Sequence, residues 1–178
     1  MSIDISPEQM EKRVSRFDKL RAQPGIFLDF AFPECEREIF RVLGNGVKDR
    51  ASLEIAPAID NPVHFNIGMA RCQPGHGAAL HSHLTDEVFL ALDGTWLIMW
   101  GDQGEHSITL NQWDVIAVPP GVMRGFRNIG DTTACLYTVL GGADPGRLTW
   151  SPDVVRRARE RGYELDEAGH LKPVQAVG

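Results

Sequence analysis

The sequence predicts an all-β fold, a sandwich or barrel, with a helical extension at each end. Eight segments of strand length follow one another from Val63, each ended by Gly, Pro, Asn or Asp, and no helical pattern separates them. The 18 glycines and 11 prolines of the 178-residue chain agree with many turns. Two sequences typical of turns lie at 101–104 and 111–114. The predicted strands cover residues 63–72, 78–83, 87–92, 95–100, 105–110, 115–118, 123–128 and 133–140.

The chain before these strands is predicted to begin with a helix over residues 6–23. Ser6 offers an N-cap, Pro7 suits the first helical position and Gln9 completes a capping box. Gly25, after a proline, ends the pattern. Apolar residues recur at helical spacing at Met10, Val14 and Phe17. Three later apolar pieces indicate short strands at 26–32, 39–43 and 53–58.

A second helix is predicted after the last strand. It begins at Ser151-Pro152-Asp153 and ends at Gly162, and a polar tail follows from Tyr163. Its predicted buried residues are Val154, Val155 and Ala158. We therefore expect one structural domain in three parts: residues 1–62 as a helix and short strands packed on the barrel, 63–140 as the barrel core, and 141–178 as a helix and tail.

Two predicted strands, Trp96–Trp100 and Ala134–Leu140, are apolar at successive positions. A strand with one solvated face would alternate between apolar and polar residues, so both faces of these strands are expected to be covered. The terminal helices or a second copy of the chain can supply that cover. The pattern favours a homodimer.

Composition narrows the class of partner. The net charge is −6, with 18 basic and 24 acidic side chains, whereas nucleic acids and anionic membranes call for a basic surface. No apolar run approaches the eighteen or so residues of a membrane span, and Met1–Gln9 has no signal-peptide pattern. The three cysteines are scattered, as in proteins with reduced thiols. We therefore expect a cytoplasmic protein without nucleic-acid or membrane partners.

The most informative stretch runs from Gly75 to Gly94. His81 and His83 are two residues apart, so on a strand both imidazoles project from the same face. Two neutral imidazoles beside a carboxylate suit a divalent metal. Glu87 has the same parity, but four residues of strand span about 13 Å and metal–ligand bonds are about 2 Å long. The chain is therefore expected to turn at 84–86 and to bring Glu87 across on the next strand.

The spacing Gly-x5-His-x-His-x3-Glu-x6-Gly resembles the first motif of the cupin superfamily. Its positions here are Gly75, His81, His83, Glu87 and Gly94. The resemblance covers roughly residues 63–140. It implies a double-stranded β-helix, or jelly-roll barrel, with N- and C-terminal helical extensions outside the motif. It also implies that His81, His83 and Glu87 are metal ligands.

The second cupin motif, Gly-x5-Pro-x-Gly-x2-His-x3-Asn, is matched only in part. Pro119, Gly121 and Asn128 fit the pattern. Trp113 stands in place of the opening glycine, and because a tryptophan with positive φ would be strained, Asn111 is expected to take the turn position. Arg124 stands in place of the fourth ligand, a histidine, and a guanidinium has no lone pair to donate to a metal.

Arg124 leaves two interpretations open. In one, it forms a buried bidentate pair with Glu87 and the barrel holds no metal. In the other, His81, His83 and Glu87 bind a metal as a two-His-one-carboxylate face, as in non-haem Fe(II) oxygenases, and Arg124 holds a substrate carboxylate or enolate. The metal interpretation is preferred. Iron is the expected ion, with manganese, nickel, zinc or copper as alternatives.

The resemblance therefore predicts a small metal-dependent cupin enzyme, a dioxygenase of the non-haem-iron type acting on a small carboxylated or enolisable substrate. Glu87 and Arg124 are the predicted catalytic residues. Arg124 and His76, which lies in a loop near the barrel mouth, are the predicted contacts to an anionic small molecule. The alternatives are a metal-free small-molecule binding or sensor cupin and a metal-dependent isomerase or lyase.

Overall fold

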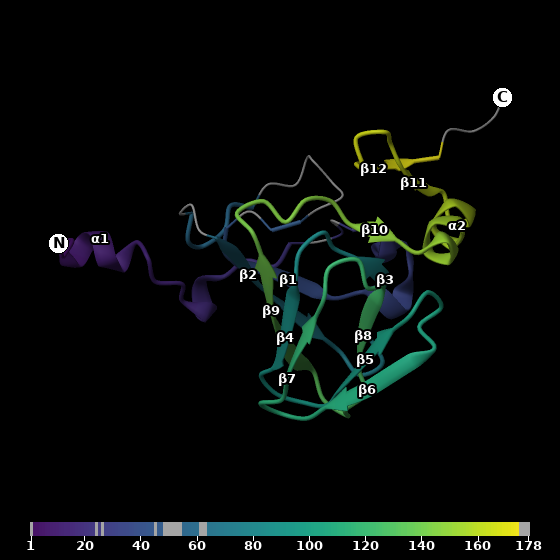
Figure 1. Ribbon diagram of the computed structural model, residues 1–178, viewed down its shortest axis with the longest axis horizontal. Helices are drawn as coiled ribbons and strands as arrows, with labels where there is room; N and C mark the ends of the chain where they lie inside the picture. Colours follow the sequence, from purple (N-terminus) through teal and green to yellow (C-terminus); the bar gives the residue numbers. More distant parts are fainter. Residues whose placement is uncertain are drawn as a thin grey trace.

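Two five-stranded antiparallel sheets face each other and form the body of the protein (Figure 1). The computed structural model describes residues 2–23, 25, 27–44, 46–47, 55–60 and 64–174. Sheet A has the order β1 (Glu38–Leu43), β2 (Phe65–Cys72), β9 (Ala134–Gly141), β4 (Glu87–Ala91) and β7 (Val115–Val118). Sheet B has the order β10 (Thr149–Trp150), β3 (Gly77–Ser82), β8 (Arg124–Asn128), β5 (Trp96–Trp100) and β6 (His106–Leu110).

The chain crosses repeatedly between the sheets, which confirms the predicted all-β jelly roll. Strand β3 lies in sheet B, β4 in sheet A, β5 and β6 in sheet B, β7 in sheet A, β8 in sheet B and β9 in sheet A. Each of the eight predicted strands is present, with bounds that differ from the expectation by two residues at most.

The core fills the space between the sheets because strand residues alternate in direction. On β4, Phe89 and Ala91 are fully buried whereas Val88 and Leu90 are half-buried. The inward side chains form one apolar cluster: Ala70, Cys72, Ala78, Phe89, Ala91, Trp96, Ile98, Leu110, Val118, Phe126, Ala134 and Leu136. A second cluster joins the two extensions to one end of the barrel: Phe27, Leu28, Phe32, Cys35, Trp150, Val154 and Ala158.

The predicted helix over 6–23 is wrong in length. Helix α1 covers only Pro7–Glu11, and a 3-10 turn, η1 (Phe17–Lys19), follows it. The capping box of Ser6 and Gln9 is formed as expected, but no residue of α1 is buried. Because a short helix in water depends on packing for its stability, the apolar spacing alone does not extend the helix.

The region between α1 and the barrel corrects two of the three predicted short strands. Residues 28–35 form 3-10 turns, η2 (Leu28–Ala31) and η3 (Pro33–Cys35), and their apolar residues Leu28, Phe32 and Cys35 are buried in the second cluster at spacings of four and three rather than at every second position as in a strand. Ile26 lies outside the described residues. The piece at 39–43 is confirmed as part of β1. Residues 53 and 54 also lie outside the described part, and 55–58 form no strand.

The C-terminal extension follows the prediction more closely. Helix α2 covers Pro152–Glu160, and Ser151 caps it by accepting a hydrogen bond from the Val154 N–H. Val154 and Ala158 are buried, but Val155 was wrongly assigned to the core and is 44% exposed. The tail forms a hairpin of β11 (Tyr163–Leu165) and β12 (Leu171–Pro173). Among the described residues, no helix is long and apolar enough to span a membrane.

Trp113 occupies the left-handed backbone region, with a φ of 71°, so the expectation that Asn111 would take this role is wrong. The turn between β6 and β7 keeps the geometry that a glycine would favour. Trp113 is 66% exposed, so its indole meets none of the packing clashes that would exclude a bulky residue from a buried turn. The remaining cost is local backbone strain of roughly 1–2 kcal/mol.

Gly77→Ala is predicted to destabilise the protein by about 2 kcal/mol or more. A Cβ at Gly77 would stand 2.7 Å from the carbonyl carbon of Phe126 and 2.8 Å from the Cα of Arg127, and backbone atoms cannot move aside as a flexible side chain does. Urea denaturation measures the change. Gly121→Ala is the control because nothing lies within 4 Å of its Cβ, and its positive φ alone costs about 1 kcal/mol. Equal losses in the two variants would contradict the steric explanation.

Candidate metal site

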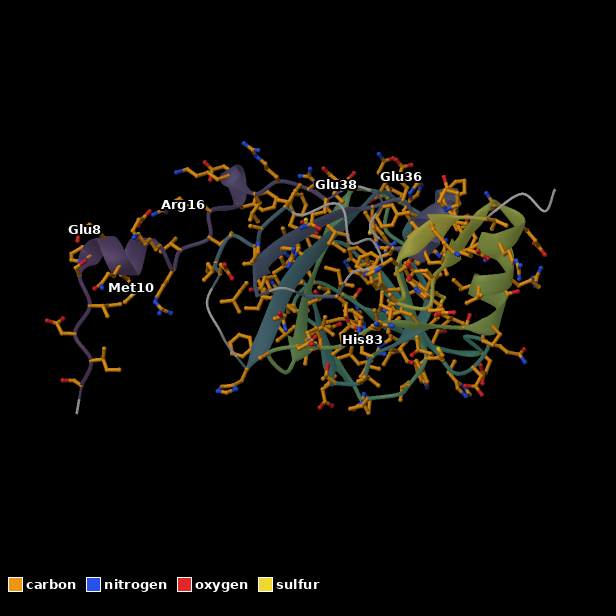
Figure 2. All side chains as sticks on the ribbon, turned by 90° about the horizontal axis from the view of Figure 1, so that it is seen from above. Glu8, Met10, Arg16, Glu36, Glu38 and His83 are labelled. Atoms are coloured by element: carbon orange, nitrogen blue, oxygen red, sulfur yellow. The ribbon has the colours of Figure 1, made fainter. Side chains whose placement is uncertain are left out.

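His81, His83 and Glu87 converge inside the barrel, as their spacing predicts. His81 lies near the end of β3 in sheet B, His83 follows that strand, and Glu87 opens β4 in sheet A. Each offers a ligand atom, and these atoms all lie within 4.8 Å of one another. All three side chains are buried, and Figure 2 shows His83 within the body of the molecule. The turn at 84–86 therefore brings Glu87 back beside the two histidines, as predicted from the sequence.

The tautomer of His81 is set by its own strand. Its Nδ1 lies 2.7 Å from the carbonyl oxygen of Ala79, so Nδ1 carries the proton and donates it there. The lone pair of Nε2 is then available to a metal. Burial lowers the pKa of His81 to about 3, against a weaker opposing effect of the hydrogen bond to Ala79. The ring is therefore neutral near pH 7.

His83 is held by its backbone rather than by a hydrogen bond of its ring. Its carbonyl accepts the N–H of Gly121 at 2.9 Å, which ties it to the loop before β8. Its Nε2 lies 3.4 Å from Glu87 Oε2, and its Nδ1 has no hydrogen-bond partner among the described residues. Burial, and next the neighbouring His81, lower the pKa of His83 to about 2. Both imidazoles are thus neutral, and each can donate a nitrogen lone pair to a metal.

Arg124 lies beside Glu87. Its Nε is 3.1 Å from Glu87 Oε2, its Nη1 donates to the carbonyl of Val122 at 3.0 Å, and its side chain is fully buried. The contact is a single approach through Nε, so the bidentate pair of the metal-free interpretation is not formed. Burial raises the pKa of Glu87 to about 7, although the Arg124 charge opposes this, and burial lowers the pKa of Arg124.

A cavity of about 90 Å³ adjoins the three candidate ligands. His81, His83 and Glu87 lie on its wall, but Arg124 does not. Arg124 stands behind Glu87, so its placement does not support the predicted direct contact with substrate. Two arginines that the sequence reasoning missed, Arg37 and Arg41, are among the residues that line the wall. The apolar part of the wall includes Phe27, Ile39, Phe40, Ile67, Met69, Leu140, Leu148 and Trp150.

His76 is not brought to this cavity. Its Nδ1 lies 3.0 Å from the carbonyl oxygen of Glu36, and its side chain lines a separate surface groove together with Glu38 and Arg71. His76 is predicted to contact the anionic small molecule, but its position away from the cavity beside His81 does not support that contact.

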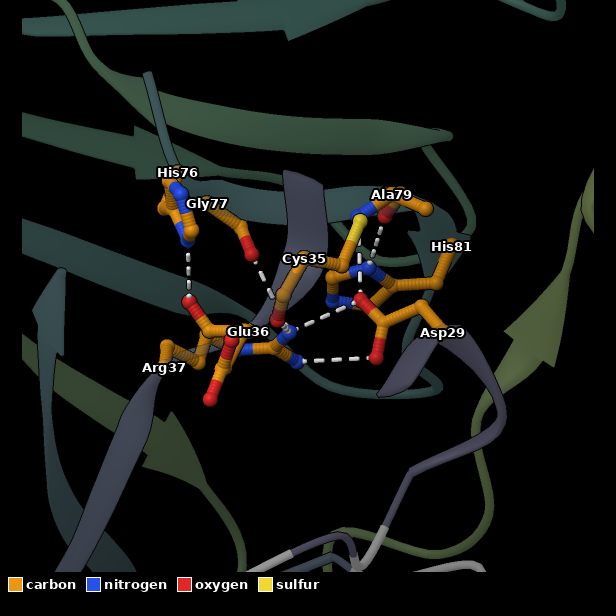
Figure 3. Close-up of polar contacts among 8 residues, drawn as sticks. All are labelled: Asp29, Cys35, Glu36, Arg37, His76, Gly77, Ala79 and His81. Atoms are coloured by element: carbon orange, nitrogen blue, oxygen red, sulfur yellow. Dashed lines mark hydrogen bonds and ion pairs between the residues drawn. The ribbon is translucent and has the colours of Figure 1, made fainter. Parts of the chain in front are cut away.

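A buried ion pair joins the N-terminal segment to the strand that carries His81 (Figure 3). Arg37 approaches both carboxylate oxygens of Asp29, at 3.0 and 3.1 Å. Asp29 also accepts the N–H of Ala79 at 3.0 Å, and Arg37 donates to the carbonyl of Gly77 at 3.1 Å. Both peptides lie on β3 within four residues of His81. Asp29 and Arg37 therefore fix the backbone that orients the imidazole.

Asp29→Asn is predicted to lower stability by about 3–5 kcal/mol, because it leaves the Arg37 guanidinium buried without its counter-charge. Thermal unfolding of the variant measures the loss. Glu38→Gln is the control: it removes an ion pair with Arg71 that is 36–46% exposed, and such pairs contribute about 1 kcal/mol or less. Similar losses in the two variants would contradict a special role for the buried pair.

The donor set fits a divalent transition metal. Two neutral imidazole nitrogens and one carboxylate are the ligands that iron, manganese, nickel, copper and zinc accept. Two buried polar atoms at this point have no hydrogen-bond partner among the described residues, His83 Nδ1 and Arg124 Nη2, and Glu87 Oε2 has only the Arg124 Nε contact and the His83 Nε2 contact. Buried polar atoms are normally satisfied, so the group has the character of a binding site.

The family comparison agrees with the site. A family model for the cupin domain matches residues 68–140. A curated relative, germin-like protein subfamily 1 member 4 of Arabidopsis thaliana, is 26% identical over 114 residues, which are 60% of this chain and 51% of that protein. The chain thus spans about half the length of that relative.

Two solved structures are similar to parts of this chain. A structure of oxalate oxidase aligns over 68% of this chain and 57% of its own, with 20% identity and a TM-score of 0.51. A variant of salicylate 1,2-dioxygenase from Pseudoaminobacter salicylatoxidans aligns over 44% of this chain and 20% of its own, with 17% identity and a TM-score of 0.39. At these identities the likeness concerns the fold. The facing sheets and the motif spacing agree with the family model, so residues 68–140 of this chain are a cupin domain.

Proposed function

We propose that this protein is a metal-dependent cupin enzyme that acts on a small anionic organic substrate. The proposal depends on one observation, the convergence of His81, His83 and Glu87 on a buried point beside a cavity. Three protein ligands leave up to three positions of an octahedral ion for substrate and a second reactant. Iron is the preferred ion, and a bound iron supplies Lewis acidity and redox chemistry with O₂.

The charge of the site favours an anion. The two histidines are neutral, and the charge of ionised Glu87 is balanced by Arg124 at 3.1 Å. A divalent ion would therefore leave a net charge of about +2 in a buried site, whereas a fourth histidine in place of Arg124 would leave +1. A buried excess charge is costly unless it is neutralised, so Arg124 strengthens the demand for an anionic ligand.

The cavity limits the size of that ligand. A volume of about 90 Å³ holds a few waters or an organic acid of a few heavy atoms. Its wall is largely apolar, which lowers the local dielectric and strengthens electrostatic contacts inside. Arg41 also lines this wall, whereas the charge of Arg37 is balanced by Asp29, and a small carboxylate is the substrate class that we propose. An oxygenase reaction is the proposed chemistry, because a two-His-one-carboxylate face leaves room for both substrate and O₂.

The chain's own residues have distinct parts in this proposal. His81 is oriented by its bond to Ala79, and His83 by the Gly121 contact at its carbonyl. Arg124 contacts Oε2 of Glu87 and so turns and polarises that carboxylate. We assign Arg124 a positioning role through Glu87, because it does not reach the cavity wall.

A second candidate function is metal-free binding of a small molecule. The close approach of buried Arg124 to buried Glu87 favours it, because the guanidinium already balances the carboxylate without an ion. In that case the cavity would serve as a ligand pocket and His81 and His83 as neutral hydrogen-bonding groups.

Elemental analysis of protein purified without chelator separates the two candidates. The proposal expects near-stoichiometric iron or another divalent transition metal, and oxygen consumption by the iron-loaded protein with one or more members of a panel of small carboxylates. Protein that takes up no metal even after anaerobic loading would contradict the enzyme proposal and leave the binding function.

The affinity for metal is predicted to fall by about tenfold per pH unit as the pH decreases below about 7. A metal must displace any proton on the atoms that bind it, and of the three ligating groups the Glu87 carboxylate, with its pKa raised to about 7, is the one that is protonated between about pH 4 and 7. The pKa values of His81 and His83, near 3 and 2, keep both rings unprotonated there. Competition titrations at several pH values measure the slope.

A matched control tests which group titrates. Glu87→Gln should bind metal more weakly and lose the pH dependence over this range. A slope near two or three in the wild-type protein would mean that the histidines also release protons, in conflict with their burial.

A further inference from the structure

The inward face of strand β9 is apolar except for one threonine. Thr138 is directly opposite Phe89, a fully buried core residue of β4, so its side chain also points into the barrel. The other inward residues of β9 are buried and apolar: Ala134, Leu136 and Leu140. Thr138 lies on the wall of the cavity beside the candidate ligands. A hydroxyl turned toward an apolar interior needs a hydrogen-bond partner.

The Thr138 hydroxyl is open to the cavity. No hydrogen bond within the described part of the chain involves its Oγ1. The side chain is half-buried, and because it points inward, its exposed part faces the cavity. The residue opposite it on β2 is Gly68, where a Cβ would stand 3.0 Å from Thr138 Oγ1. The missing side chain therefore leaves the hydroxyl uncovered.

The neighbouring polar side chains of the wall already have backbone or ion-pair contacts. Asn66 accepts a peptide N–H at Oδ1, at 2.9 Å, and its Nδ2 donates to a carbonyl at 2.8 Å. Arg37 is held in its buried ion pair, and Arg41 donates to a backbone carbonyl at 3.0 Å. Thr138 carries the only hydroxyl among the described residues that line the cavity. It is therefore well placed to bind a ligand at a point away from the candidate metal ligands.

The strand register sets the separation between Thr138 and the candidate metal site. Glu87 is directly opposite Leu140, and Thr138 precedes Leu140 by two residues on the same face of β9. Diagonal neighbours of this kind in an antiparallel pair lie about 7–8 Å apart. A ligand that reaches both groups therefore needs a polar group at each end and a short apolar part between them. The small cavity and its largely apolar wall suit such a molecule.

We propose that Thr138 is a specificity-determining residue and that the cavity takes a short carboxylic acid with a second hydrogen-bonding group at its far end. The carboxylate lies where His81, His83 and Glu87 converge, an assignment that rests on the proposed function. The far group is a hydroxyl, a carbonyl or a second carboxyl. Each of these can pair with Thr138, because a threonine hydroxyl both donates and accepts. A plain alkanoate of the same length leaves the hydroxyl unpaired and binds more weakly.

Calorimetric titration with two acids of nearly equal size tests the proposal. The acids are butyrate and 3-hydroxypropionate, which differ by a terminal hydroxyl in place of a methyl group. Protein loaded with zinc, a redox-inert ion, and metal-free protein are both titrated, and the metal content of each sample is measured. The hydroxy acid should bind about fivefold or more tightly than butyrate to the zinc-loaded protein. The same preference, at lower affinity, is expected without metal, because the Thr138 contact does not involve the ion.

Three variants assign that preference to the Thr138 hydroxyl. Thr138→Val removes the hydroxyl with little change of shape, so the ratio of the two affinities should fall to about one. Thr138→Ser keeps the hydroxyl and should keep most of the preference. Gly68→Ala leaves the hydroxyl in place but covers it, and should also lower the ratio. The matched control is Thr109→Val, the same change at an exposed position of β6, which should leave the ratio as in the wild type. Metal uptake should be the same in all of these proteins.

The two readouts separate this inference from the proposed function. Equal affinities for the two acids in the wild type, or an unchanged preference in folded Thr138→Val, would overturn the role of Thr138 even where metal binds. Binding of neither acid to either form would overturn it as well. Protein that takes up no metal would contradict the proposed function instead, and the ratio in the metal-free protein then decides the role of Thr138. Circular dichroism verifies folding, and Gly68→Ala supplies the test if Thr138→Val does not fold.

Discussion

His81→Ala is expected to lower metal affinity by at least a hundredfold and to leave the purified protein essentially free of metal. The change removes one of three ligands, and loss of even an outer-shell contact typically costs 10–100-fold. The remaining pair, His83 and Glu87, would hold an ion with only two protein atoms. Elemental analysis gives the metal content, and competition with a chromophoric chelator gives the dissociation constant.

His76→Ala is the control for this substitution. It removes the same kind of side chain from a groove that does not include the candidate ligands, so metal content should stay at the wild-type level. Thermal unfolding should show that both variants are folded, because His81→Ala also removes a ring packed 5.3 Å from Trp150. Wild-type metal content in His81→Ala would rule out the site described here.

The candidate ligands could be found from the sequence because their geometry is local. His81 and His83 are two residues apart, and such residues on one strand share a face. Because a metal–ligand bond is short, the chain has to turn before Glu87 for its carboxylate to reach the same ion. Neither step depends on distant parts of the chain. The strands were predictable for the same reason, since the turn residues and the alternation that define them lie within each segment.

The parts that escaped prediction depend on contacts between distant residues. Asp29 and Arg37 meet Ala79 and Gly77 across 50 and 40 positions of sequence, and no local pattern marks that meeting. Asp29 stands among apolar residues, but Arg37 has Glu36 and Glu38 as direct neighbours in the sequence, so nothing local indicates that Asp29 is its partner. The N-terminal helix was overestimated because its apolar spacing implies a surface to pack on, and the described body offers none to α1.

Arg124→His is expected to tighten metal binding at least tenfold, or about 1.4 kcal/mol. Two effects act in the same direction. Arg124 is directly opposite His81 in the register of β8 and β3, and its side chain points inward to Glu87, so an imidazole there can add a fourth nitrogen ligand. The substitution also removes a positive charge that repels the ion in a poorly screened interior. Competition titration against the same chelator measures the gain.

Arg124→Gln separates the two effects because it removes the charge without supplying a strong donor. We expect the metal affinity to be highest with His at position 124, lower with Gln and lowest with the wild-type Arg. Arg124→Lys should stay close to the wild type because it keeps the charge. Without metal, Arg124→Gln should raise the pKa of Glu87 further, because the guanidinium that opposes the effect of burial is gone, and the variant should therefore lose stability increasingly as the pH rises above 7. Added metal should restore part of that loss, since the ion takes over as the counter-charge. If Arg124→His and Arg124→Gln bind metal equally well, residue 124 does not reach the ion, and if neither exceeds the wild type, the guanidinium does not oppose metal binding at all.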